Sequence, residues 1–151
     1  MAIQIRRAVP DDGPAYISLV RALADFEKLD PPDAAACQRL LDDAFCDPPL
    51  YRLWVAELDG EVVCYAVTFP TYSTFLAKPT LWLEDIFVHP NARRRGVATA
   101  VLAHLRSEAE ATGCGRMEWS VLDWNTGALT LYERIGATLL HDWRICRLVL
   151  P

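Results

Sequence analysis

LWLEDIFVHPNARRRGVATAVLAHLRSEAEA, residues 81–111, decides the fold because strand-like sequence becomes helix-like sequence across one short loop. Residues 81–88 are apolar on both faces except for Glu84 and Asp85, as is typical of a central strand that carries two charges. The apolar residues that follow have helical spacing, which predicts a helix over residues 97–111. Those apolar positions are Val97, Val101, Leu102, Leu105 and Ala109.

The loop between these two elements concentrates positive charge at the start of the predicted helix. Arg93, Arg94 and Arg95 directly precede Gly96. The free N–H groups of a helix's first turn bind phosphate, and a glycine lets a ligand approach the backbone closely. The spacings of the nucleotide P-loop and of the dinucleotide fingerprint are absent. The pattern therefore indicates a phosphate-binding loop over residues 93–96, and a merely solvated charge run is the alternative interpretation.

Outside this stretch, the hydrophobic periodicity predicts a mixed α/β fold. Asp59-Gly60 lies between two strand-like runs, which is the signal of a tight hairpin. Asp11 or Asp12 is expected to cap the first helix, and Asp33 to start the second. The order suggests antiparallel hairpins followed by a strand-helix-strand crossover. The remaining predicted strands are residues 3–7, 51–58, 61–69, 116–122 and 143–150, and the remaining helices are residues 10–29, a segment from 33 and residues 126–135.

The composition limits the classes of function. A chain of 151 residues fits a single domain, residues 1–151, and its net charge of −5 provides no broad basic face for nucleic acid. No apolar run is long enough to span a membrane, and the spread of the cysteines and histidines predicts neither a disulfide framework nor a metal site. We therefore expect a cytoplasmic protein with reduced thiols. The five cysteines are Cys37, Cys46, Cys64, Cys114 and Cys146.

Arg93-x-x-Gly96-x-Ala98 resembles the signature (Q/R)-x-x-G-x-(G/A) of the GCN5-related N-acetyltransferase (GNAT) family. LADFEKL (23–29), LWLEDIFV (81–88) and DWNTGALTLYERIGA (123–137) resemble its diamine branch, the spermidine/spermine and thialysine N-acetyltransferases. The resemblance extends over nearly the whole chain. It implies a strongly twisted mixed sheet, flanked by helices, whose fourth and fifth strands splay apart to admit the pantetheine arm of acetyl-CoA.

The same resemblance assigns residues to acetyl-CoA. It implies that backbone groups of Ile86, Phe87 and Val88 pair with pantetheine and face the acetyl carbonyl. Asn125 corresponds to a contact of the coenzyme A arm, although an Asn at this position is equally suited to capping a helix. The residues implied to hold the pyrophosphate are Arg94, Arg95, Gly96, Val97, Ala98 and Thr99.

For chemistry, the resemblance implies Tyr132 as the acid that protonates the departing thiolate and Glu84 as the base, acting directly or through water. The structural alternatives are an apolar helix position for Tyr132 and a hydrogen-bonded structural carboxylate for Glu84. Strand alternation directs Asp85 to the opposite face, so it is the weaker candidate for the base. Phe26, Glu27 and Glu84 correspond to residues that line the acceptor site of the relatives. Phe26 replaces a tyrosine there.

Together these residues predict acetyl transfer from acetyl-CoA to a primary amine of a diamine, a polyamine or a lysine-like amino acid, by direct attack. Ser73 and Thr74 stand where the polyamine enzymes carry an acidic residue, which weakens spermidine as the specific acceptor. The relatives imply a homodimer. Two alternatives remain open at this point, an N-acetyltransferase of proteins or peptides and a non-catalytic acyl-CoA-binding module.

Overall fold

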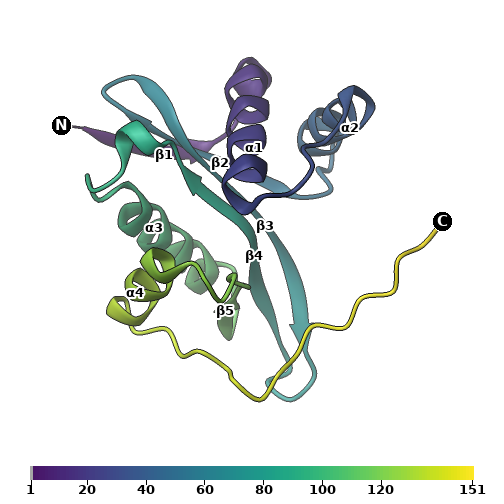
Figure 1. Ribbon diagram of the computed structural model, residues 1–151. Coiled ribbons are helices and arrows are strands. Elements are labelled where there is room, and N and C mark those ends of the chain that lie inside the picture. Colours follow the sequence, from purple (N-terminus) through teal and green to yellow (C-terminus); the bar gives the residue numbers. More distant parts are fainter. Residues whose placement is uncertain (1) are drawn as a thin grey trace. The chain divides into compact units, whose positions relative to one another are not determined.

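The computed structural model describes residues 2–151, which form two compact units, one up to Ser120 and one over Val121–Pro151. The first unit contains a five-stranded sheet in the order β1-β2-β3-β4-β5 (Figure 1). Neighbouring strands are antiparallel except for β4 and β5, which are parallel. The strands are β1 Ile3–Arg7, β2 Arg52–Leu58, β3 Glu61–Ser73, β4 Lys78–Val88 and β5 Arg116–Glu118.

Helices cover both faces of this sheet (Figure 1). On one face, α1 (Gly13–Glu27) and α2 (Ala34–Phe45) pack against the sheet. Helix α3 (Val97–Ala111) packs on the other face, where His104 meets the Trp54 ring edge-on. The core beneath α1 and α2 consists of Tyr16, Leu19, Ala44, Leu53, Tyr65, Val67 and Phe87.

Several sequence predictions are confirmed. Helix α3 covers the predicted residues, and the parallel pairing of β4 with β5 makes α3 the crossover helix. Asp59 and Gly60 turn the chain between β2 and β3 with positive φ angles of 52° and 88°. Asp33 caps α2 by accepting a hydrogen bond from the Ala36 N–H.

The predicted cap of α1 is correct in position, because Asp12 is the N-cap residue, but the expected side-chain hydrogen bond is not formed. Neither Asp11 nor Asp12 makes a side-chain cap bond to this helix. The Asp12 carboxylate instead accepts two hydrogen bonds from Arg6, at 2.7 and 2.9 Å, and one from the Val9 N–H at 2.8 Å. This pairing with Arg6 lowers the pKa of Asp12 and attaches the start of α1 to β1.

Two predicted strands differ from the structure. The strand predicted over residues 116–122 ends at Glu118, where its pairing with β4 also ends. Residues 143–150 were expected to form a last strand, but the structure gives them no strand pairing. A strand needs a neighbour as well as a β-rich composition, and the sequence specifies only the composition.

Strands β3 and β4 extend beyond the predicted ranges 61–69 and 81–88 and include Pro70 and Pro79. Both prolines lie in the β3–β4 ladder, in which Pro70 pairs with Leu81 and Pro79 with Tyr72. The pairing of β3 with β2 stops at Thr68, so Pro70 lies where β3 has an open edge and its missing N–H breaks no ladder bond.

In the second unit, α4 covers Thr126–Arg134 and confirms the helix predicted there. The residues after it are largely exposed.

Candidate functional site

The loop between β4 and α3 is shaped to receive an anion. Arg94 and Gly96 have positive φ angles of 61° and 79°, and Gly96 occupies the N-cap position of α3. No side chain caps this helix, so the N–H groups of its first turn remain available. A Cβ placed on Gly96 would meet no atom within 4 Å, so the approach to the backbone is open. Arg94 and Arg95 are exposed beside it.

These features fit a pyrophosphate group. Helix N–H groups and two guanidinium groups supply charge-assisted donors, and the positive end of the α3 dipole adds to the attraction. Val97 is buried and Thr99 is exposed at the first turn of α3, and pyrophosphate binding by residues 94–99 stays a prediction.

Beside the loop, β4 has an open backbone edge. Its pairing with β5 ends at Trp82, and no residue from Leu83 to Val88 has a β5 partner in the described part of the chain. The N–H of His89 donates to Val63 on β3 at 2.7 Å, and backbone groups alternate in direction along an antiparallel ladder. The backbone groups of Ile86 and Val88 therefore face the open edge.

Phe87 differs from its two neighbours. By the same alternation its backbone groups face β3, and its side chain is buried in the core beneath α1. Of the three residues predicted to present backbone groups, Ile86 and Val88 are the two that the sheet leaves accessible.

A β-bulge changes the direction of the carboxylates on β4. Trp82 pairs with Phe69, and Asp85 pairs with Val67. Two residues of β4 therefore lie between these pairs but only one residue of β3, and Glu84 is the extra residue that has no partner. Because Phe69 and Val67 share a face, Trp82 and Asp85 share it as well. Strict alternation would place Asp85 on the face opposite to Trp82, so the alternation expected along this strand does not hold across the bulge.

The two carboxylates of the bulge have different surroundings. Glu84 is exposed, and its Oε1 accepts a hydrogen bond from the Trp82 indole at 3.2 Å. Asp85 is half-buried and accepts a hydrogen bond from the Tyr65 hydroxyl at 3.1 Å. Burial raises the pKa of Asp85 to about 6, and the charges of Glu84 and Glu27 act in the same direction, whereas the Tyr65 hydrogen bond opposes them.

Glu27 lies at the end of α1, close enough to act electrostatically on Asp85, and burial raises its own pKa. The structure thus places Glu27 near the β4 carboxylates. Tyr65 was missed by the sequence analysis because an apolar strand around a tyrosine gives no sign that its hydroxyl reaches a carboxylate.

Arg93 connects α1, β4 and the loop. Its Nε donates to the Val88 carbonyl at 3.2 Å, and its guanidinium lies over the rings of Phe26 and Phe87, at 5.2 and 5.4 Å from their centroids. Arg93 therefore differs in role from Arg94 and Arg95, because it holds the loop against the end of α1. The signature motif alone does not distinguish the three arginines.

In the second unit, Asn125 and Tyr132 belong to α4. Asn125 is the N-cap, and its Oδ1 accepts a hydrogen bond from the Ala128 N–H at 3.2 Å. The capping alternative for Asn125 is thus observed, and a contact with coenzyme A stays a prediction. Tyr132 is half-buried, and its carbonyl accepts a hydrogen bond from Ala137.

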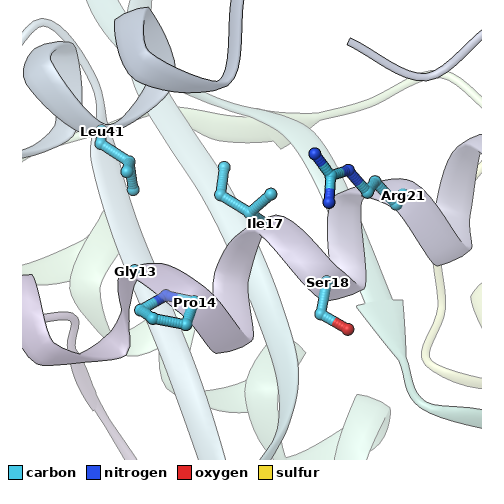
Figure 2. A pocket seen from close by; sticks show the side chains of 6 residues that line it. All are labelled: Gly13, Pro14, Ile17, Ser18, Arg21 and Leu41. Carbon is cyan, nitrogen blue, oxygen red and sulfur yellow. The ribbon is translucent and has the colours of Figure 1, made fainter. Parts of the chain in front are cut away.

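An open hollow between α1 and α2 lies apart from these residues (Figure 2). None of the predicted site residues lines it. Its lining consists of Gly13, Pro14, Ile17, Ser18, Arg21 and Leu41.

None of the helices within residues 2–151 combines the length and apolar character needed to cross a membrane. No group of three or more His, Cys, Asp or Glu side chains gathers there as metal ligands. Ser73, discussed above for the acceptor, is buried, and its Oγ accepts a hydrogen bond from the Leu76 N–H.

Comparison with known proteins is consistent with this site. Thialysine N-epsilon-acetyltransferase of Bos taurus is 34% identical over 148 residues, which cover 93% of this chain and 86% of that protein. L-ornithine N5-acetyltransferase NATA1 of Arabidopsis thaliana is 39% identical over 103 residues, 68% of this chain, but the match spans only 45% of its own length. A solved ribosomal-protein-alanine N-acetyltransferase from Brucella melitensis biovar Abortus 2308 shares the fold, with a TM-score of 0.77 at 21% identity, covering 99% of this chain and 100% of that one.

The model of the Acetyltransferase (GNAT) family matches residues 18–137, which include the open edge of β4, its carboxylates and the loop before α3. Members of this family use acetyl-CoA as co-substrate, for which the loop has suitable donors. This chain belongs to the GNAT family of acetyltransferases.

Proposed function

We propose that this acetyltransferase transfers the acetyl group of acetyl-CoA to a primary amine of a small acceptor, a diamine, a polyamine or a lysine-like amino acid. The observation that supports this proposal most is the cluster of three carboxylates from α1 and β4, in which burial raises the pKa of Asp85 and the charges of Glu84 and Glu27 add to this effect. Such a cluster suits a cationic amine. The thialysine relative, similar over most of both chains, supports the same class of acceptor.

In this proposal, the loop over residues 94–99 holds the pyrophosphate of acetyl-CoA. Backbone groups of Ile86 and the N–H of Val88 on the open edge of β4 are suited to pair with the pantetheine arm and to face the acetyl carbonyl, whereas the Val88 carbonyl already accepts a hydrogen bond from Arg93. Backbone N–H groups fixed in a sheet stabilise the negative charge that develops on a carbonyl oxygen without having to reorient. Phe87, whose backbone faces β3, supports this edge from below, and Asn125 is the proposed contact of the coenzyme A arm.

The amine must lose a proton before it attacks. An alkylammonium has a pKa of about 10.4, so about one molecule in a thousand is the free amine near pH 7. Glu84 is exposed on the acceptor side of the bulge and is the proposed base, acting through an ordered water. Phe26 and Glu27 at the end of α1 are the proposed acceptor-binding residues.

Tyr132 is the proposed acid that protonates the departing thiolate. Replacing Tyr132 with Phe removes the phenolic proton and keeps the ring, so we expect kcat to fall at least about a hundredfold while acetyl-CoA affinity stays within about twofold. Steady-state kinetics and calorimetry measure the two effects. Unchanged kcat in this variant would exclude Tyr132 as the acid.

The proposed reaction is tested by incubating the protein with acetyl-CoA and a pool of spermidine, putrescine, thialysine, ornithine, lysine, aminoglycosides and short peptides. Mass spectrometry of the products avoids the background that the protein's own thiols give in a thiol-release assay. An acetylated small amine is the expected result. Acetylated peptides alone would identify a protein N-acetyltransferase, and acetyl-CoA binding without any product would favour a binding module.

We also propose that residues 1–151 act as a single acetyltransferase domain, a proposal supported by the family match, which runs across the boundary between the two compact units. The cytoplasm is the proposed location, since all five cysteines are free thiols.

The proposed assembly is a homodimer in which residues 143–150 pack on a second copy of the chain. Five large apolar side chains of this segment are between 75% and 87% exposed in the single chain, a density of apolar surface that favours burial against a partner. They are Trp143, Ile145, Leu148, Val149 and Leu150.

A further inference from the structure

Asp85 is set apart from the other acidic residues near the β4 edge by its surroundings. Its carboxylate accepts a hydrogen bond of 3.1 Å from the hydroxyl of Tyr65, a fully buried residue with 0% exposure. The bulge places Asp85 directly after the exposed Glu84 and on the face of the sheet that α1 covers. The exposed carboxylate of Glu84 is therefore followed directly in the chain by the partly buried carboxylate of Asp85.

Burial and the charges of Glu84 and Glu27 favour the protonated form of Asp85, and only the hydrogen bond from Tyr65 favours the ionised form. Of the groups that face Asp85, two are carboxylates and three are phenols, and in the described part of the chain none of the ion pairs includes Asp85. Arg93 lies over the rings of Phe26 and Phe87. The facing groups are Tyr65 from β3, Glu27 and Tyr16 from α1, Glu84 from β4, and Tyr51 from the segment before β2.

We propose that Asp85 is the final acceptor of the proton that the substrate ammonium loses, and that Glu84 passes this proton to it from the surface. This inference rests on the proposed amine acetylation and adds a second carboxylate to it. Two neighbouring carboxylates that share one proton form a coupled pair, and the buried member retains the proton more strongly.

The reaction moves two protons from the substrate nitrogen and exchanges a C–S bond for an N–C bond. The ammonium gives one N–H proton through Glu84 to the Asp85 carboxylate, and the freed nitrogen lone pair forms the N–C bond with the acetyl carbonyl carbon. The C–S bond breaks, its electron pair leaves on sulfur, and the proposed acid protonates the thiolate. The nitrogen then loses a second proton, which restores the acid, and Asp85 releases its proton to solvent.

Asp85 must be ionised to accept the proton, so kcat/KM should fall at low pH as Asp85 becomes protonated. Substitutions of its neighbours should shift the pH at which this fall occurs. In the wild type we expect this fall, the acid limb of the kcat/KM profile, near pH 6. Tyr65→Phe removes the hydrogen bond that favours the ionised form, so the limb should move to higher pH. Glu27→Gln removes a like charge, so the limb should move to lower pH.

The experiment measures kcat/KM from pH 5 to pH 9 for the acceptor that gives most product in the pooled assay. Asp85→Asn should lower kcat/KM at pH 7 by about a hundredfold or more and leave acetyl-CoA binding intact. Asp25→Asn removes an exposed charge two residues before Glu27 and is the matched control, with an unchanged profile.

Opposite shifts in the Tyr65 and Glu27 variants support the inference, because a merely structural role of Asp85 gives no such pair of shifts. An unmoved acid limb in both variants, or an Asp85→Asn enzyme within about threefold of the wild-type rate, would overturn it. Should Asp85→Asn fail to fold, the two other variants still decide. If the wild-type protein acetylates no acceptor in the pool, the proposed function itself fails and the inference falls with it.

Discussion

At the scale of single residues, the β-bulge at Glu84 is the most consequential feature. A register shift of one residue places Asp85 on the same face as Trp82, beside Tyr65 and within electrostatic reach of Glu27. A carboxylate in these surroundings is costly to ionise, which links the chemistry proposed for it to the stability of the protein.

Asp85→Asn is expected to stabilise the protein at pH 8. Because the pKa of Asp85 is raised from 3.8 to about 6 on folding, the folded state binds its proton more tightly than the unfolded state. The wild type therefore loses stability as pH rises from about 4 to 6, by about 3 kcal/mol, and this loss persists above pH 6. The variant lacks the loss, so its melting temperature at pH 8 should exceed that of the wild type by several degrees.

Thermal unfolding of both proteins between pH 4 and pH 8 measures this difference. The gain should shrink as pH falls through 6 and vanish near pH 4, whereas Asp25→Asn should show no gain at any pH. An Asp85→Asn protein that is less stable than the wild type at pH 8 would show that its carboxylate is not destabilised by burial.

At the scale of the elements, the sequence predicted what depends on local periodicity. Helix α3 and the hairpin at Asp59-Gly60 are specified by residues that lie next to each other in the chain, and both were predicted correctly. The strand expected over residues 143–150 was wrong because a strand also depends on a distant partner.

In the candidate site, too, features set by neighbouring residues were predicted, and features set by distant residues were not. The motif from Arg93 to Ala98 was enough to predict that α3 begins after Gly96, since its glycine and its position before a helix are local features. Anion binding by this loop stays a prediction. The bulge at Glu84 depends on how β3 pairs with β4, and the place of Arg93 over Phe26 depends on α1. Neither can be read from the residues of β4 alone.

The two ends of α3 provide a matched test of the loop. Gly96 precedes the helix with a φ of 79° and Gly113 follows it with a φ of 77°, and a Cβ at either position would meet nothing within 4 Å. Alanine at each position should therefore cost a similar strain, about 1 kcal/mol of unfolding free energy.

Only Gly96→Ala should weaken acetyl-CoA binding, by about tenfold or more in calorimetry, because only this glycine lies beside the free N–H groups of the first turn. Equal acetyl-CoA affinity of the Gly96 and Gly113 variants would exclude the loop as the pyrophosphate site.

At the scale of the whole molecule, the exposed apolar side chains of residues 143–150 are the proposed contact between two copies of the chain. Ile145 and Leu148 are 75% and 87% exposed, and the proposed homodimer would bury them. We expect Ile145→Asp combined with Leu148→Asp to convert a dimer into a monomer at micromolar concentration, because burying two carboxylates opposes association.

Sedimentation velocity measures this change of mass. Leu50→Asp is the control, because Leu50 is 69% exposed on a different segment and its variant should remain dimeric. A wild-type chain that sediments as a monomer would refute the proposed assembly.

Acetyl transfer to a small amine can be followed with a labelled acetyl group. The wild-type protein is incubated with acetyl-CoA deuterated in its acetyl methyl group, and with thialysine and ornithine as acceptors. We predict that mass spectrometry finds the labelled acetyl group on an acceptor amine, with one free coenzyme A formed for each acetylated molecule. Retention of the label on coenzyme A, with the acceptors unchanged at saturating acetyl-CoA, would contradict the account.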